Sequence, residues 1–186
     1  LEGLEFSILC NNCLGGVFLH DVGRQFCSPT VNLAFDGEEF IKFLESPQYY
    51  LDGDFEFIEY EDITYPVALV NGIEIRFVHY KTQEECIQKW RERSKRIRWD
   101  NLFIVATDND GLGRSDLLER FDRLPFVNKI MFTAQELPQY SWAITVPEYK
   151  GRFQVNGMTM LANLRGQRKY EKCFDLVEYI KQRCAE

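Results

Sequence analysis

Short, continuous apolar runs recur along this chain, and most of them end at asparagine, aspartate or glycine. Such runs are typical of buried strands, because both faces of a buried strand contact apolar neighbours. They predict strands at residues 4–10, 29–35, 101–107, 128–133 and 142–146. We expect the first run, which ends at Asn11, to be an interior strand with a helix starting near the glycine pair that follows it.

The stretches between these runs carry apolar residues at helical spacing. They predict helices at residues 15–22, 37–45, 83–97, 115–124 and 168–184. Two of these helices begin with a capping-box pattern. Asp36 stands three residues before Glu39, and Thr82 stands three residues before Glu85.

A hairpin interrupts this alternation at residues 65–80. Asn71 and Gly72 tolerate the positive φ angles of a two-residue type I′ turn. The acidic, alternating segment 55–63 predicts an exposed edge strand. Together the elements predict one α/β domain over residues 1–186. We expect a three-layer α/β/α sandwich with a mixed, mainly parallel sheet and one antiparallel hairpin.

Composition narrows the class of protein. Hydrophobic residues make up 45% of the chain and charged residues 27%, as in ordinary globular proteins. The net charge of −7 argues against general nucleic-acid binding. We expect neither a transmembrane segment nor a signal peptide, because no apolar run approaches ~20 residues and no basic residue precedes the first one. The six cysteines are too sparse for a disulfide scaffold, so we expect reduced thiols and a cytoplasmic location.

The segment ILCNNCLGG, residues 8–16, is the first candidate for chemistry. A redox CxxC places its nucleophile at a helix start, whereas Cys10 ends the predicted strand, and no second ligand pair supports zinc. Two interpretations remain. Asn11, Asn12 and the backbone of Gly15 and Gly16 bind a sugar or an anion at a helix start, or the glycines only let the helix pack closely on the sheet.

Asp108 and Asp110 directly follow the predicted strand 101–107. Two carboxylates at a strand end can share Mg²⁺ or Mn²⁺, which in turn binds a diphosphate. The sequence DND is similar to the D-x-D element of metal-dependent nucleotide-sugar glycosyltransferases. The alternative is a solvated turn that caps the next helix.

His79 ends the hairpin segment, and the alternating pattern places it on the same face as Ile75 and Phe77. A histidine near its unperturbed pKa of about 6.5 is suited to act as a general base. The alternative is a hydrogen-bonded histidine of the core.

Residues 89–99 carry six basic side chains and one acidic one in this acidic chain. At helical spacing, the predicted buried stripe consists of Ile87, Trp90, Ser94 and Ile97. One flank of the helix carries Arg91, Lys95 and Arg98. We expect this flank either to bind phosphate or an acidic glycan or to form a solvated, ion-paired face.

Several segments in this order resemble a bacterial family catalogued as domain of unknown function nineteen-nineteen. The segments are NNCLGG, SPTVNL, FVHYKTQEECIQKW, IRWDNLFI, DNDG and FDRLPFVNKIMFT. Members of that family are often labelled exopolysaccharide biosynthesis proteins. The resemblance therefore implies a three-layer α/β/α domain that works in surface-polysaccharide assembly.

These observations favour an enzyme of surface or exopolysaccharide biosynthesis, a transferase acting on a sugar or nucleotide-sugar. We expect its ligand to be a sugar, a nucleotide-sugar or another phosphate-bearing small molecule. We expect His79 to be the base and Asp108 and Asp110 to hold the sugar or a metal, with residues 147–167 as a covering flap. The rivals are a non-catalytic glycan- or partner-binding module and a cysteine-dependent oxidoreductase.

Overall fold

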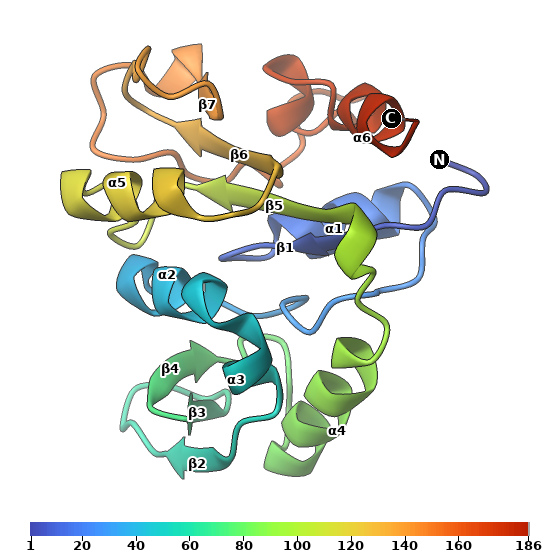
Figure 1. Cartoon of the computed structure of the whole chain (residues 1–186). Coiled ribbons are helices and arrows are strands. Elements are labelled where there is room, and N and C mark those ends of the chain that lie inside the picture. The colour runs from blue at the N-terminus through green and yellow to red at the C-terminus, as the bar shows by residue number, and fades with distance from the viewer. Residues whose placement is uncertain (186) are drawn as a thin grey trace.

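The computed structural model describes residues 1–185, and a parallel sheet of four strands forms its centre (Figure 1). The strand order is β1 (Ser7–Leu9), β5 (Leu102–Thr107), β6 (Asn128–Thr133) and β7 (Ala143–Thr145). All neighbouring pairs in this sheet are parallel. The carboxyl ends of the strands therefore lie together on one side of the sheet, and their amino ends lie on the opposite side. We call these sides the carboxyl edge and the amino edge; they differ from the lateral edges of the sheet, which β1 and β7 form.

Two layers of apolar side chains cover this sheet, one on each face, because the side chains of β5 alternate. Phe103 and Val105 pack in a core with α1 (Leu14–Asp21) and α6 (Leu176–Cys184). Ile104 and Ala106 pack in the opposite core. That core includes residues of α2 (Gly37–Glu45), α4 (Gln83–Ser94) and α5 (Ser115–Arg123).

The predicted hairpin is present but belongs to a second sheet. Its strands β3 (Val67–Val70) and β4 (Ile73–Arg76) turn at Asn71 and Gly72, with φ angles of 49° and 89°. With the edge strand β2 (Phe55–Ile58) they form an antiparallel sheet in the order β2-β3-β4. Helix α2 lies between the two sheets in Figure 1, followed by the short α3 (Pro47–Leu51). The α/β class is confirmed, with two sheets instead of one mixed sheet.

The strand β1 lies at the edge of the parallel sheet, so the expectation of an interior strand was wrong. It is fully buried because segment 27–35 covers its open side. The backbone N–H of Cys10 donates to the Thr30 hydroxyl (3.0 Å), and that of Phe35 donates to the Asn11 carbonyl (3.0 Å). Side-chain hydrogen bonds and single backbone hydrogen bonds thus cover β1 where a neighbouring strand would otherwise pair with it. Residues 29–35, which we expected to form a strand, do not form one.

The end of the chain also differs from the prediction. Residues 168–184 do not form one helix, because Asp175 interrupts it. The Asp175 carboxylate accepts the backbone N–H of Glu178 (2.9 Å) and so starts α6. A separate 3₁₀ turn, η3 (Tyr170–Lys172), precedes it, and the two other 3₁₀ turns are η1 (Trp99–Asn101) and η2 (Pro147–Tyr149).

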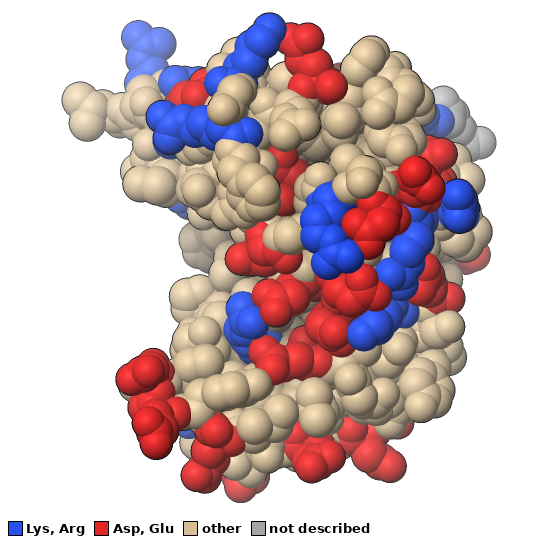
Figure 2. Space-filling view, turned by 90° about the vertical axis from the view of Figure 1, so that its left-hand side faces the viewer, with Lys and Arg blue, Asp and Glu red and all other residues tan. Residues whose placement is uncertain are grey.

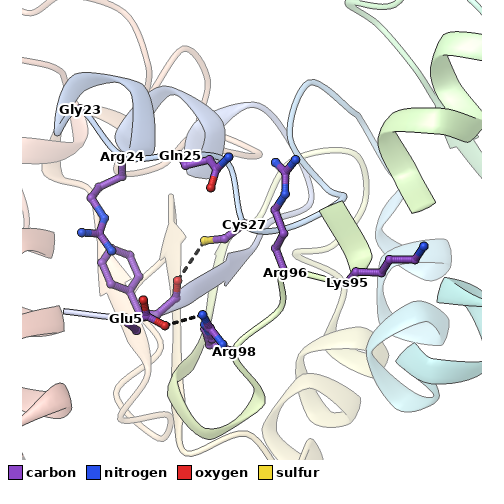
Figure 3. A pocket seen from close by; sticks show the side chains of 9 residues that line it. Glu5, Gly23, Arg24, Gln25, Cys27, Lys95, Arg96 and Arg98 are labelled. Carbon is purple, nitrogen blue, oxygen red and sulfur yellow. Dashed lines mark hydrogen bonds and ion pairs between the residues drawn. The ribbon is translucent and has the colours of Figure 1, made fainter. Parts of the chain in front are cut away.

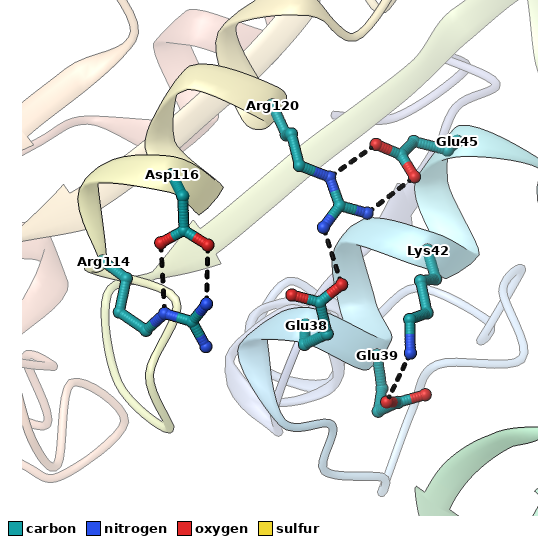
Figure 4. Close-up of polar contacts among 7 residues, drawn as sticks. All are labelled: Glu38, Glu39, Lys42, Glu45, Arg114, Asp116 and Arg120. Atoms are coloured by element: carbon teal, nitrogen blue, oxygen red, sulfur yellow. Dashed lines mark hydrogen bonds and ion pairs between the residues drawn. The ribbon is translucent and has the colours of Figure 1, made fainter.

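Ion pairs join α2 to α5 on the surface. Arg120 donates hydrogen bonds to both oxygens of Glu45 (2.8 Å each) and to one oxygen of Glu38 (2.6 Å), as Figure 4 shows. These hydrogen bonds hold the pKa of Glu45 below its ordinary value. Figure 2 shows acidic and basic side chains side by side across the middle of this face. Carboxylates therefore neutralise much of the positive charge on this face.

Candidate functional site

Asn11 joins the carboxyl ends of β1 and β5. The side chain is fully buried, and its Nδ2 donates to the Thr107 carbonyl (3.0 Å) and to Asn109 Oδ1 (3.0 Å). Its Oδ1 accepts the backbone N–H of Thr107 (3.1 Å). The side chain thus continues the parallel ladder where the strand ends. Asn11 therefore positions Thr107 and Asn109 by hydrogen bonds.

Asn12 connects this edge to the start of α1. Its Oδ1 accepts the backbone N–H of Leu14 (2.9 Å), and its Nδ2 donates to the Thr107 hydroxyl (2.6 Å) and, at 3.3 Å, to Asn109 Oδ1. Asn109 Oδ1 also accepts from Asn11 Nδ2 and from the Thr107 hydroxyl (2.5 Å). Three donors therefore fix the Asn109 amide. Its Nδ2, with two N–H donors, makes no hydrogen bond to any described residue.

A pocket of about 190 Å³ opens beside this amide cluster, and we name it the carboxyl-edge pocket. Its lining comprises Asn12, Cys13, Thr107, Asn109, Val155, Gly157, Met158 and Thr159. The last four belong to the segment predicted as a flap. No charged side chain of the described chain lines the pocket. It therefore presents amide and hydroxyl groups against an apolar wall of Val155 and Met158.

The glycine pair supports the packing interpretation. A Cβ at Gly15 would lie 3.1 Å from the Cβ of Cys10 and 3.1 Å from a methyl group of Ile8. A Cβ at Gly16 would lie 2.9 Å from a methyl group of Val31. A side chain at either position would force these neighbouring side chains to shift, because α1 lies directly on β1 and its covering segment. Neither glycine lines the carboxyl-edge pocket, and a ligand role for their backbone stays a prediction.

Asp108 holds the flap against the sheet. This buried carboxylate accepts the backbone N–H of Ala134 (2.7 Å) with one oxygen and that of Val155 (2.7 Å) with the other. Burial raises the pKa of Asp108 above its ordinary value, although the two N–H groups act in the opposite direction. The geometry gives Asp108 a structural role, because it ties β5, the end of β6 and the flap together.

Asp110 faces a different neighbourhood. It is exposed, and its backbone carbonyl accepts the N–H of Gly37 (2.7 Å). Partial burial, and then the nearby Asp36 carboxylate, raise the pKa of Asp110. Within residues 1–185, no three His, Cys, Asp or Glu side chains are grouped to hold a metal ion. A Mg²⁺ or Mn²⁺ site at these carboxylates stays a prediction.

The two cysteines of the opening segment are free thiols, as are the other four. Cys10 is buried under the start of α1, and this burial raises its pKa to about 11. Cys13 is half-buried at the pocket wall, and burial raises its pKa as well. A thiol with a raised pKa is a poor nucleophile at neutral pH. The geometry therefore disfavours thiol chemistry at either position.

His79 lies away from this edge. The strand β4 ends at Arg76, three residues earlier than expected, and belongs to the second sheet. A turn follows, in which the backbone N–H of Tyr80 donates to the Phe77 carbonyl (3.0 Å). The turn breaks the alternation, so His79 is exposed while Phe77 is buried. The expected convergence of His79 with the asparagines and aspartates does not occur.

The basic segment is not a continuous helix. Helix α4 ends at Ser94. Trp90 and Ile97 are buried as expected, but Cys86 and Arg93 are buried in place of Ile87 and Ser94, and Ile87 is 38% exposed. Arg91 donates to the carbonyls of Leu51 (2.9 Å) and Gly53 (2.6 Å). Arg91 therefore binds the carbonyl groups at the carboxyl end of α3, and it does not line a pocket together with Lys95 and Arg98.

Lys95 and Arg98 instead line a second pocket, of about 470 Å³, at the amino ends of β1 and β5 (Figure 3). We name it the amino-edge pocket. Its described lining comprises Glu5, Phe6, Gly23, Arg24, Gln25, Cys27, Lys95, Arg96 and Arg98. The sequence pattern did not identify Arg24. It follows α1 and stands far from the basic segment in sequence, so only the fold brings these cations together.

The comparisons with known proteins agree with one another. The model of the family described as "Domain of unknown function (DUF1919)" matches residues 1–181. A relative from Haemophilus influenzae, named "Uncharacterized protein", is 34% identical over 179 residues, which cover 96% of this chain and 85% of the relative. The chain belongs to this bacterial family. Among the described residues, no helix has the length and apolarity needed to cross a membrane.

Proposed function

We propose that this member of the family is a glycan-binding module, which holds one sugar residue in the carboxyl-edge pocket during surface-polysaccharide assembly. The observation that carries the proposal is the Asn109 amide. Its oxygen accepts three internal donors, which leaves the NH₂ group to a ligand. Such an amide donates to sugar hydroxyls without a charge partner. The polysaccharide context is what the family resemblance implies.

The chemistry of the pocket favours a neutral ligand. Thr159 offers a hydroxyl with no hydrogen bond to a described side chain, and Val155 and Met158 offer apolar contact. An anion would gain little here, because no Lys or Arg of residues 1–185 lines the pocket. A volume of about 190 Å³ is smaller than the roughly 300 Å³ at which pockets for drug-sized ligands begin. We therefore assign it one sugar ring rather than a whole nucleotide-sugar.

A sugar transferase, the leading expectation from the sequence, stays a prediction. Transfer needs a general base near the acceptor hydroxyl. The residue expected for this, His79, is exposed in the turn after β4. Both oxygens of Asp108 already accept backbone N–H groups. Release of nucleotide from a nucleotide-sugar in the presence of Mg²⁺ or Mn²⁺ would test this activity.

We also propose, from its free thiols, that the protein works in the cytoplasm.

Calorimetric titration with D-glucose, D-galactose and N-acetyl-D-glucosamine tests the binding proposal. We expect saturable binding of at least one sugar, reduced tenfold or more in Asn109→Asp. This variant keeps the oxygen that accepts the three internal donors and replaces only the NH₂ group. The control is Asn156→Asp, which adds the same charge at an exposed position outside the pocket lining. Equal binding by wild type and Asn109→Asp would refute the proposal.

A further inference from the structure

We propose that the amino-edge pocket is a second binding site, specific for a small molecule that carries a phosphate group. The pocket collects four cationic side chains and, among its described lining, one carboxylate. The cations are Arg24, Lys95, Arg96 and Arg98. The whole chain has a net charge of −7, so the lining of this pocket has the opposite sign of charge to the chain as a whole.

Among the described residues, Arg98 is the one of these four cations that forms an ion pair, and the charge of Arg96 also acts on the Glu92 carboxylate. Arg98 pairs with Glu5 at 2.5 Å. Arg24, however, donates to the backbone carbonyls of Leu1 (3.4 Å) and Leu4, and Arg96 donates to that of Phe26 (3.1 Å). A carbonyl orients a guanidinium but carries no net charge. These arginines thus differ from Arg120, which two glutamates neutralise.

Three of the four cations come from residues 95–98, and the fourth, Arg24, comes from the segment after α1; the Lys95 side chain extends away from the other three in Figure 3. Figure 3 shows Arg24 and Arg96 on either side of Cys27, with Arg98 below them. The guanidinium of Arg24 lies 5.5 Å from the centre of the Phe6 ring, and this contact limits its motion. The hydrogen bonds to carbonyls restrict Arg24 and Arg96 further. The donors are therefore held in place before a ligand arrives, which lowers the entropy lost on binding.

Phosphate fits this arrangement better than a single carboxylate. Each guanidinium presents five N–H donors in a planar fork that matches the oxygens of phosphate. A phosphate monoester carries a charge of about −1.5 to −2 at neutral pH, enough to engage more than one arginine. The volume of about 470 Å³ leaves room for an organic group beside the phosphate. The ligand class is therefore a phosphorylated small molecule.

This site is independent of the proposed sugar site. The strand β5 has six residues and is about 16 Å long at roughly 3.3 Å per residue, and the two pockets lie at its opposite ends. The residues that line them do not overlap. Loss of phosphate binding would leave the sugar proposal standing, and the reverse also holds.

Calorimetric titration with inorganic pyrophosphate tests the proposal, with citrate as an anion without phosphorus. We expect pyrophosphate to bind more tightly than citrate, with an affinity that falls at high salt. Arg96→Gln should weaken the binding about tenfold. Glu5→Gln should strengthen it several-fold, because it removes the carboxylate that lines the pocket and pairs with Arg98. The control is Arg123→Gln on α5, where the arginine pairs with Glu119 at the surface.

Thermal unfolding of each variant shows whether the fold is kept, and Glu5→Gln provides a test in the direction of gain. Absence of pyrophosphate binding, or equal binding by Arg96→Gln and Arg123→Gln, would overturn the proposal. Citrate binding as tight as that of pyrophosphate would overturn the assignment to phosphate. Weaker binding by Glu5→Gln would contradict the charge argument.

Discussion

The two edges of the parallel sheet are built on different principles. At the carboxyl edge, the polar side chains are neutral or bonded to backbone, and they satisfy one another in a closed set of hydrogen bonds. At the amino edge, four of the polar side chains that line the pocket are cations, and Arg24 and Arg96 donate to neutral backbone carbonyls. The first edge therefore uses its polar groups to hold the fold, with one amide left for a ligand. The amino edge leaves positive charge available to bind an anion.

This difference predicts which substitutions lower the free energy of unfolding most. A buried donor or acceptor that loses its partner costs about 1–3 kcal/mol, whereas an exposed charge contributes little to stability. Changes at the carboxyl edge should therefore lower the free energy of unfolding. Changes at the amino edge should alter binding and leave that free energy nearly unchanged.

The largest effect is expected for Asn11→Ala. The variant leaves the backbone N–H and carbonyl of Thr107 without their side-chain partner in a buried position. We expect the free energy of unfolding to fall by about 2–4 kcal/mol, measured by urea denaturation. The exposed Asn156→Ala is the control and should change it by less than about 0.5 kcal/mol. A similar small loss in both variants would mean that the carboxyl edge does not depend on Asn11.

A smaller loss, about 1–3 kcal/mol, is expected for Asp108→Asn. An amide offers one oxygen, so its NH₂ group must face the backbone N–H of Ala134 or Val155. Full stability of Asp108→Asn would contradict the structural role of this carboxylate.

The pH dependence separates the charge of Asp108 from its shape. Burial raises the pKa of this carboxyl in the folded protein above 3.8. Its contribution to stability is therefore fully present below pH 3.8 and is lost as the pH rises through the raised pKa. Asp108→Asn lacks this titration, so the difference between the two proteins should be largest in acid and narrow towards neutral pH. A constant difference across this range would contradict the raised pKa.

The smallest effect on stability is expected for Arg96→Gln. Its guanidinium is partly exposed and donates to the Phe26 carbonyl. We expect the free energy of unfolding to change by less than about 1 kcal/mol in urea denaturation. A loss comparable to that of Asn11→Ala would mean that the amino edge, too, holds the fold, and the contrast between the edges would fail.

Several elements that carry clear local signals are present in the structure. Asn71-Gly72 forms the hairpin turn, and the Thr82 hydroxyl accepts the N–H of Glu85 (3.2 Å) at the start of α4. Residues 102–107 form β5, one of the two inner strands of the parallel sheet. In each case the determining residues stand within a few positions of one another, so the sequence carries the information.

Features that depend on distant residues were missed. The edge position of β1 depends on a covering segment around Thr30, and its apolar sequence alone does not distinguish a covered edge from an interior strand. Period-two spacing placed His79 on a buried face, but the turn after Phe77 exposes it. Arg24 and Arg96 share a pocket only because α1 returns to the amino edge of the sheet.

The central claim is that the two edges bind different ligands through different groups. A single calorimetric experiment tests it, in which wild type, Asn109→Asp and Arg96→Gln are each titrated with the sugars and with pyrophosphate. We predict that Asn109→Asp loses sugar binding and keeps pyrophosphate binding, and that Arg96→Gln does the reverse. Loss of both ligands in one variant, or of neither in both, would contradict the claim.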